Sequence, residues 1–395
     1  MNDDCSPKVG RSSRLVHMGR SSSDGCAVNP SIERASTYLY GSVEAMRDVE
    51  ASRAKGERTR AYGRRGSQTG FHLEDALVEM EHGYRARLVS SGLAANVLVF
   101  LSTLKAGDHA IVSDGVYGPV RKFATNALKR HGVDFDFCRA DGTDVETLLR
   151  ANTRLIYLEV PGSVLFEVAD LPRIASLAKA AGAWLAVDNT WASGWLYKPL
   201  ALGADISVVS ATKYLNGHSD VLLGAVVANE AAWPLINDMA ELTGVSVSPD
   251  DAYQVLRGLR TLAVRMKAHA DHASRLVDWF KTQPFVQRTY YPASSDHDGF
   301  ALWQRDFAGA SGLFSIELKP AFDEQRAIAF VDALRLFGIG SSWGGFESLA
   351  RLENAATLRT ASTPPVGHVI RFHAGLEDVD DLLRDVATAS RIFIG

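Results

Sequence analysis

The sequence predicts an α/β protein built on a mostly parallel sheet with helices on both faces, followed by a smaller α+β domain. Strand and helix patterns alternate from Phe71 to Asn229, which is the order of a parallel sheet that is covered on both faces. The later elements follow a less regular, more antiparallel order. Residues 1–65 are polar, serine- and arginine-rich and weakly periodic, which indicates an extended arm. We therefore expect an arm (1–65), a large domain (66–258) and a C-terminal domain (259–395).

Apolar runs define the predicted strands, and apolar residues three or four positions apart define the helices. In the large domain we expect helices at Phe71–His82, Leu93–Leu104, Val120–His131, Val145–Arg150 and Leu171–Ala181. The expected strands are Ala86–Ser90, His109–Ser113, Val133–Cys138, Thr153–Val160, Trp184–Asp188, Ile206–Val209 and Gly224–Asn229. One long helix, Ala252–Ala273, leads into the second domain, with helices Ala273–Thr282 and Glu324–Leu334 and strands Phe285–Tyr291, Gly312–Leu318 and Val369–Ala374.

Composition narrows the class of protein. A chain of 395 residues that is 46% hydrophobic can bury a sizeable core, and its length suggests two or three domains. A net charge of -4 gives no basic footprint for nucleic acid. Cys5, Cys26 and Cys138 are scattered, which predicts reduced thiols and no metal cluster. No secretory h-region and no membrane-length apolar run is found, so we expect a soluble cytoplasmic protein.

A lysine stands at the end of one predicted strand. Ser210 and Thr212 precede Lys213, and glycine and small polar residues follow it. Ligands of α/β sheets collect at strand ends. A lysine beside hydroxyl groups that can bind a phosphate suits a Schiff base to an aldehyde cofactor. If only this short segment around Lys213 is considered, a surface lysine that follows a strand is an equally good interpretation.

Two other segments are candidates for binding an anion. Gly92 opens a helix directly after a strand, which places free backbone N–H groups and the positive end of the helix dipole at one point. A helix cap without a ligand is the alternative there. The segment Ala61–Gly66 holds Arg64 and Arg65 between two glycines, beside Tyr62, which makes a compact anion-binding group. Taken alone, that segment is also compatible with a solvated loop.

Three further residues stand at positions suited to a ligand. Asp188 ends an apolar strand, where it can cap the next turn or act as a working carboxylate. Tyr117 is presented from a loop at the end of another strand. Arg371 lies among apolar residues in the last strand, so it needs an anionic partner, and a structural salt bridge is one such partner.

Taken together, these residues predict one chemistry. Asp188 and Lys213 stand at strand ends, Gly92 and the hydroxyl groups supply phosphate binding, and Tyr117 supplies an aromatic ring at the same edge. A pyridine aldehyde that carries a phosphate needs these groups: an amine for the aldehyde, a carboxylate for the ring nitrogen and a ring to stack on. The predicted cofactor is therefore pyridoxal 5'-phosphate (PLP).

The chain resembles the transsulfuration family of PLP-dependent enzymes, in its cystathionine β-lyase branch. Motifs from Tyr62 to Asp380 carry this resemblance: Ala-Tyr-Gly-Arg-Arg-Gly (61–66), Asp-Asn-Thr-Trp (188–191), Ala-Thr-Lys-Tyr-Leu (211–215), Gly-His-Ser-Asp (217–220), Ser-Trp-Gly-Gly (342–345) and Gly-Leu-Glu-Asp-Val-Asp-Asp (375–381). The resemblance implies a PLP-dependent transferase-like fold of the aspartate aminotransferase type.

The resemblance also implies a role for each matching residue. Lys213 resembles the Schiff-base lysine, Asp188 the partner of the pyridine nitrogen and Tyr117 the tyrosine that stacks on the ring. The implied phosphate ligands are Gly92, Leu93, Ser210, Thr212 and, from a neighbouring subunit, Tyr62 and Arg64. The implied substrate ligands are Arg371 for the α-carboxylate, with Ser342, Trp343 and Tyr117 beside it. The resemblance also implies active dimers within a homotetramer.

Two segments decide the branch. Pro161-Gly-Ser-Val164 replaces the Asn-Pro that γ-elimination and γ-replacement relatives usually carry, and Ser-Ser-Trp-Gly-Gly (341–345) is close to the β-lyase pattern. The implied activity is the α,β-elimination of L-cystathionine to L-homocysteine, pyruvate and ammonia, a step of methionine biosynthesis, with cystine or cysteine cleavage as a side activity.

Other functions remain as alternatives. Within the family these are cystathionine γ-synthase, cystathionine γ-lyase and methionine γ-lyase. A regulatory protein that binds PLP without catalysis is a more remote alternative, and the set of Lys213, Asp188, Arg371 and Tyr117 argues against it. The chain has no G-x-G-x-x-G or Walker A sequence after any strand, which argues against a nucleotide-binding module.

Overall fold

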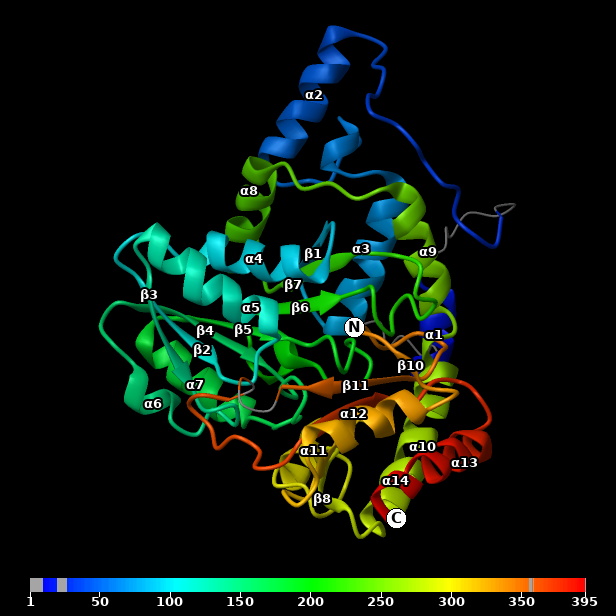
Figure 1. Ribbon diagram of the computed structural model, residues 1–395. Coiled ribbons are helices and arrows are strands. Elements are labelled where there is room, and N and C mark those ends of the chain that lie inside the picture. Colours follow the sequence, from blue (N-terminus) through cyan, green and yellow to red (C-terminus); the bar gives the residue numbers. More distant parts are fainter. Residues whose placement is uncertain (1–9, 20–26, 355–356, 358, 395) are drawn as a thin grey trace, which may run out of the picture.

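A computed structural model of the chain (Figure 1) describes residues 10–19, 27–354, 357 and 359–394. Its large domain is built on a seven-stranded sheet in the order β1-β7-β6-β5-β4-β2-β3. β7 runs antiparallel to its neighbours β1 and β6, and the other pairings are parallel, so the mostly parallel sheet is confirmed. The strands are β1 (Arg85–Val89), β2 (His109–Ser113), β3 (Asp134–Cys138), β4 (Thr153–Glu159), β5 (Trp184–Asp188), β6 (Ile206–Ser210) and β7 (Gly224–Ala228).

Helices cover both faces of this sheet, because its central strands are apolar on both sides. One face packs against α4 (Gly92–Thr103), α5 (Gly118–Phe123) and α8 (Trp233–Thr243). The other face packs against α3 (Gln68–Glu81), α7 (Leu171–Ala181) and α9 (Pro249–Leu259). The expected helix Val120–His131 is helical throughout but irregular, since α5 continues as η2 (Ala124–Leu128), a π-helix, and η3 (Lys129–His131). A short helix, α6 (Val145–Leu148), and a 3-10 turn, η4 (Pro199–Leu202), complete this domain.

The register of the central strands brings the sequence-predicted residues together. Glu159 at the end of β4 pairs with Asp188 at the end of β5, and Asp188 pairs with Val208 of β6. The carboxyl ends of three parallel strands therefore meet at one edge, and Lys213 follows three residues after β6 ends at Ser210.

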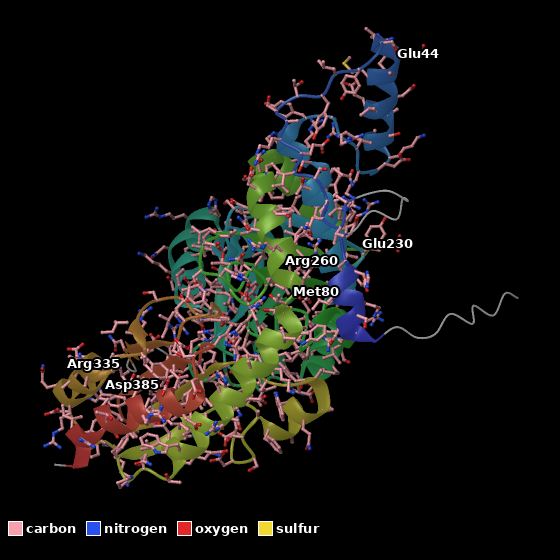
Figure 2. The ribbon with its side chains drawn as sticks, turned by 90° about the vertical axis from the view of Figure 1, so that its right-hand side faces the viewer. Glu44, Met80, Glu230, Arg260, Arg335 and Asp385 are labelled. Atoms are coloured by element: carbon pink, nitrogen blue, oxygen red, sulfur yellow. The ribbon has the colours of Figure 1, made fainter. Side chains whose placement is uncertain are left out.

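The C-terminal domain contains a five-stranded sheet in the order β10-β11-β12-β9-β8. Helices α10 (Leu262–Lys281), α12 (Glu324–Ala333), α13 (Val379–Ala389) and α14 (Arg391–Ile394) gather on one side of it, and α11 (Phe300–Asp306) follows β8. The strands are β8 (Val286–Tyr290), β9 (Leu313–Leu318), β10 (Gly338–Ile339), β11 (Leu349–Glu353) and β12 (Val369–His373). In Figure 2 Asp385 of α13 lies beside Arg335. The backbone N–H of Arg335 donates a hydrogen bond to the carboxylate of Asp385 at 2.9 Å.

The prediction of one long helix at Ala252–Ala273 is wrong, because this segment forms two helices, α9 and α10, separated at Arg260 and Thr261. The carbonyl of Gly258 accepts from the N–H and hydroxyl of Thr261 and from the Arg265 guanidinium, which diverts it from a regular helical bond. Gly258 also lies so close to the Asn216 carbonyl that a Cβ there would meet it at 2.2 Å. The expected second helix at 273–282 is in fact the continuation of α10.

The arm is more helical than the sequence indicates. It contains α1 (Arg11–His17), whose Leu15 is buried, and α2 (Val43–Ala54), which has no buried residue. Ser42 caps α2 by accepting from the N–H of Ala45. α2 stands away from the body of the molecule in Figure 1, and Glu44 marks its outer end in Figure 2. Near its end the arm has a short 3-10 turn, η1 (Gly63–Arg65). Cys5 and Cys26 lie outside the described residues, and Cys138 is a buried free thiol.

No helix within the described part of the chain combines the length and the apolar character needed to cross a membrane.

Candidate functional site

Lys213 lies where the two domains meet. Its amine donates a hydrogen bond to the hydroxyl of Ser342 at 2.7 Å and lies 5.2 Å from the ring centre of Trp343. Burial lowers the pKa of Lys213 to about 8; the charge of Arg371 lowers it further and that of Asp188 opposes the shift. A substantial fraction of this amine is therefore neutral near pH 8, which makes it a nucleophile.

The loop 342–345 can approach the segment that carries Lys213 because two of its residues are glycines. Gly344 has a φ of +86°, and a Cβ there would meet the backbone N of Tyr214 at 2.8 Å. A Cβ on Gly345 would meet the hydroxyl of Ser219 at 2.0 Å. The two glycines let the loop press Ser342 and Trp343 against the segment that carries Lys213.

Asp188 is a buried carboxylate with three hydrogen-bond donors. The N–H and hydroxyl of Thr190 donate to Oδ1 at 3.0 and 2.5 Å, and the side-chain amide of Asn96 donates to Oδ2 at 3.2 Å. Burial raises the pKa of Asp188, while these hydrogen bonds and the charge of Lys213 act against that rise. The charges of Asp188 and Lys213 each act on the pKa of the other. The contact with the following turn, one of the two interpretations that the sequence left open for Asp188, is thus present.

Arg371 of β12 approaches the loop whose Ser342 contacts Lys213. Its Nη2 lies 3.4 Å from the carbonyl oxygens of both Ser341 and Ser342. Its Nη1 lies 3.5 Å from Oε1 of Glu353, and its side chain is 11% exposed. A structural ion pair is therefore present, as one of the two interpretations expected, and it leaves other guanidinium N–H groups for an incoming carboxylate.

Tyr117 presents an aromatic ring at the same edge. Tyr117 is half exposed. Its backbone N–H donates to Oε2 of Glu159 at 2.6 Å. Burial raises the pKa of Glu159 well above its usual value. The hydrogen bond from the Tyr117 N–H to Glu159 fixes the backbone from which the Tyr117 side chain projects.

The start of α4 supplies the amides expected of a phosphate site. Ser91 satisfies the N–H groups of Ala94 and Ala95, whereas among the described residues no hydrogen bond uses the N–H of Gly92 or Leu93. A Cβ on Gly92 would meet the side chain of Ser210 at 2.6 Å, so a larger residue would disturb this contact. Two free amides and a serine hydroxyl therefore lie together at the positive end of a twelve-residue helix.

Two of the expected phosphate ligands, Thr212 and Arg64, have other contacts, and a third, Tyr62, is exposed. The Thr212 hydroxyl donates to the Leu223 carbonyl at 3.3 Å and accepts from its N–H at 3.0 Å. Arg64 contacts Glu241, with Nη1 at 3.2 Å from its carbonyl oxygen, and Tyr62 is half exposed. No hydrogen bond or ion pair within the described part of the chain joins Tyr62 or Arg64 to Lys213 or Asp188.

Some residues of this site are not evident from the sequence. Asn96 and Thr190 hold Asp188, and Glu159 holds Tyr117. Asn96 carried a signal, since it is a polar residue in the otherwise apolar Leu93–Leu104 run, one turn after Gly92. Glu159 also stood at a strand end, as Asp188 does.

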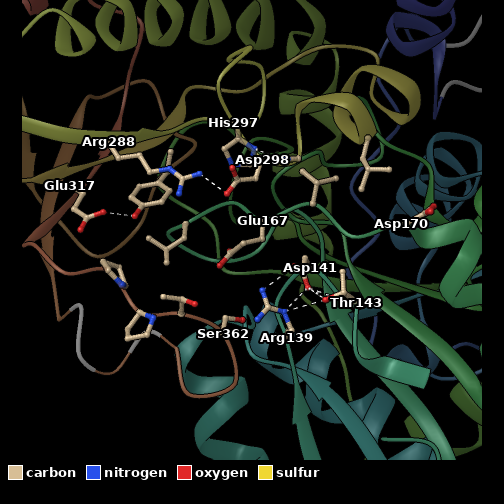
Figure 3. Close-up of a pocket in the computed structure, with 18 of the residues that line it drawn as sticks. Arg139, Asp141, Thr143, Glu167, Asp170, Arg288, His297, Asp298, Glu317 and Ser362 are labelled. Atoms are coloured by element: carbon tan, nitrogen blue, oxygen red, sulfur yellow. Dashed lines mark hydrogen bonds and ion pairs between the residues drawn. The ribbon is translucent and has the colours of Figure 1, made fainter. Parts of the chain in front are cut away.

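A separate cavity of about 780 Å³ lies between the domains, away from these residues (Figure 3). Its charged groups are already paired: Arg288 with Asp298 at 2.6 Å, and the Tyr290 hydroxyl with Glu317 at 2.5 Å. None of the sequence-predicted site residues lines it. No group of His, Cys, Asp and Glu side chains in the described ranges could hold a metal ion.

These features define an α/β protein that can hold an aldehyde covalently: a lysine with a lowered pKa, a supported buried carboxylate, an aromatic ring and free helix amides. The residues present fit pyridoxal phosphate. The chain belongs to the family described as Cys/Met metabolism PLP-dependent enzyme, whose model matches residues 12–391.

The similarity to known members covers nearly the whole chain. A cystathionine β-lyase of Bordetella avium is 44% identical over 382 residues, covering 95% of this chain and 96% of that protein. The cystathionine β-lyase MetC of Escherichia coli K12 is 39% identical over 381 residues, covering 94% and 96%. The crystal structure of a cystathionine γ-lyase from Lactobacillus plantarum, complexed with L-serine, superimposes with a TM-score of 0.85 at 31% identity, covering 96% of this chain and 98% of that one.

Proposed function

We propose that this chain is a cystathionine β-lyase, a PLP-dependent carbon–sulfur lyase that converts L-cystathionine and water to L-homocysteine, pyruvate and ammonia. The supporting observation is that Lys213, whose pKa is lowered, donates a hydrogen bond to Ser342, and that the carbonyl of Ser342 lies 3.4 Å from Nη2 of Arg371. The β-lyase relatives are 44% and 39% identical to the chain, and the γ-lyase structure 31%. Elimination at the β-carbon is therefore the reaction we favour.

Arg371 binds the α-carboxylate of the substrate through its free N–H groups, by a charge-assisted and ideally bidentate contact. Ser342 and Trp343 line the same part of the site. This contact fixes the substrate so that its Cα–H faces the amine of Lys213.

Lys213 would hold the aldehyde of the cofactor until the amine of the substrate takes its place. The amine of Lys213, freed in this way, then removes the proton from Cα. Pyridoxal phosphate, when bound, supplies a ring that accepts the electron pair left at Cα. Asp188 would keep the ring nitrogen protonated, a role that suits a buried carboxylate held by hydrogen bonds from Thr190. Lys213 or Tyr117 then gives a proton to the departing sulfur as the Cβ–S bond breaks.

The remaining roles follow from position. The amides of Gly92 and Leu93 and the Ser210 hydroxyl would bind the cofactor phosphate, with Thr212 as a further ligand. Tyr117 would supply the aromatic ring for the cofactor. Tyr62 and Arg64 would bind the phosphate of the cofactor that a neighbouring subunit holds. This explains why they contact neither Lys213 nor Asp188 in the described part of this chain.

The assembly proposed is a homotetramer of two active dimers in the cytoplasm. The exposed α2 supports it, since a helix with no buried residue in its own chain is suited to a partner's surface. We assign residues 1–65 to this contact, 66–258 to cofactor binding and 259–395 to the C-terminal domain.

The test is product analysis. Purified protein loaded with pyridoxal phosphate is incubated with L-cystathionine, and the keto acid is identified by mass spectrometry. Pyruvate in amounts equal to homocysteine supports the proposal, whereas 2-oxobutyrate shows γ chemistry and absence of any keto acid refutes a lyase.

A further inference from the structure

Two arginines lie opposite each other on adjacent strands at the edge of the site. In the antiparallel pairing of β11 and β12, Arg351 is the direct partner of Arg371. Directly opposed residues project from the same face of a sheet, and like charges in such pairs destabilise it. Arg371 occupies the position that we assign to the substrate α-carboxylate, so Arg351 extends the same surface by one strand.

A single carboxylate lies between the two guanidinium groups. Oε1 of Glu353 lies 3.5 Å from Nη1 of Arg371, and its Oε2 lies 3.6 Å from Nε of Arg351. At these distances both pairs are ion pairs without a short hydrogen bond, and Oε1 is buried with no hydrogen-bond partner in the part of the chain that the structure describes. Two guanidinium groups and one carboxylate leave one net positive charge in this trio, which an anion can balance.

The three side chains differ in how far they are exposed to solvent. The side chains of Arg371 and Glu353 are 11% and 9% exposed, whereas that of Arg351 is 44% exposed. Arg371 also carries the carbonyl contacts to Ser342, whose hydroxyl reaches Lys213. Arg371 is therefore the member of this group nearest to Lys213, and Arg351 is the member accessible to solvent, at what we call the rim of the site.

We propose that Arg351 binds the distal carboxylate of the substrate and thereby selects amino acids that carry a second carboxylate beyond the sulfur. Glu353 is a positioning residue that holds the two guanidinium groups apart, one oxygen toward each. This inference rests on the proposed function, because L-cystathionine has such a distal amino-acid end. With the α-carboxylate at Arg371 and Cα at Lys213, the distal end extends toward the rim.

The first test compares two substrates that both yield pyruvate: L-cystathionine and S-ethyl-L-cysteine, which lacks the distal charges. Arg351→Met keeps the length of the side chain and removes its charge. We expect kcat/KM for L-cystathionine to fall on the order of 10- to 100-fold, mainly through KM, because a charge-assisted contact is lost. The value for S-ethyl-L-cysteine should stay within about twofold, since it makes no contact with Arg351. Arg351→Lys is the matched control and should keep most of the preference.

The second test does not depend on turnover. Calorimetry measures the binding of glutarate and butyrate to the wild-type holoenzyme and to the Arg351→Met holoenzyme. We expect wild type to bind glutarate about tenfold more tightly than butyrate, and the variant to lose this difference. Equal losses for both substrates, no loss for either, or an unchanged preference for glutarate in the variant would each overturn the role of Arg351. A wild type that releases no pyruvate refutes the proposed function instead, and the calorimetric comparison still decides the distal site.

Discussion

The amine of Lys213 donates a 2.7 Å hydrogen bond to the hydroxyl of Ser342, a residue 129 positions later in the chain. This bond joins the end of β6 to the loop before β11, so the C-terminal domain completes the surroundings of the reactive amine. The same loop contributes carbonyl oxygens to Arg371. The two domains therefore set the properties of Lys213 jointly, and variants on either side should change them.

Removal of the amine tests its assignment directly. Lys213→Ala should abolish covalent attachment of pyridoxal phosphate and lower kcat for pyruvate release by several orders of magnitude, because proton transfer and covalent capture are both lost. Borohydride reduction followed by mass spectrometry should locate the cofactor on residue 213 in wild type and nowhere in the variant. Near-normal pyruvate release by Lys213→Ala would contradict the assignment. Lys198→Ala, which removes another partly buried lysine, is the control.

The lowered pKa of Lys213 predicts a pH dependence for cofactor capture by the apo-protein. Only the neutral amine attacks an aldehyde, so the rate should rise with pH and reach half its maximum near pH 8. Arg371→Met removes a charge that lowers this pKa, so the midpoint should move to higher pH. Asp188→Asn removes a charge that raises it, so the midpoint should move to lower pH. Absorbance during rapid mixing with pyridoxal phosphate measures the rate, and shifts in the opposite directions would disprove this account.

Asp188 should matter for rate more than for cofactor retention. Asp188→Asn keeps an acceptor for Thr190 but loses the charge that, in the proposed function, holds the ring nitrogen protonated. We expect kcat to fall about 10²- to 10³-fold, the cost typical of losing one preorganised electrostatic contact. Thr190→Val keeps the carboxylate and should cost much less. Rate measurements on cofactor-saturated protein decide this, and equal losses in the two variants would point to a structural role.

The sequence predicts much of the fold because its signals are local. Apolar runs and glycine stops locate most strands and helices within a few residues, and strand alternation alone indicates the parallel sheet. It also names Lys213 and Asp188, since both stand at strand ends. The break between α9 and α10 was missed because it depends on tertiary contacts of the Gly258 carbonyl.

Residues that act through other residues could not be predicted in the same way. Glu353 gains its meaning from the register of β11 against β12, which places Arg351 opposite Arg371. The contact of Ser342 with Lys213 likewise depends on how the two domains pack. Such relationships join positions that no sequence periodicity connects, and they decide the electrostatics of the site.

A buried carboxylate behind Asp188 predicts an unusual pH dependence of stability. Glu81, the last residue of α3, accepts from the Asn189 amide at 3.0 Å and from the Ser207 hydroxyl at 2.9 Å. Burial raises the pKa of Glu81 from 4.5 to about 7 in the folded chain, against the effect of these hydrogen bonds. Between those two values the folded chain binds more protons than the unfolded chain, so the contribution of Glu81 to stability falls as pH rises.

Glu81→Gln removes this titration while it keeps a side chain of the same size. The free energy of unfolding of the variant, relative to wild type, should therefore rise by about 3 kcal/mol between pH 4.5 and pH 7, at about 1.4 kcal/mol for each unit of pKa shift. Urea denaturation at several pH values measures it. Glu79→Gln, which replaces a half-exposed carboxylate on the same helix, is the matched control. A difference between wild type and Glu81→Gln that stays constant with pH would show that Glu81 does not titrate in this range, because any constant cost of the amide against Asn189 cancels in the comparison.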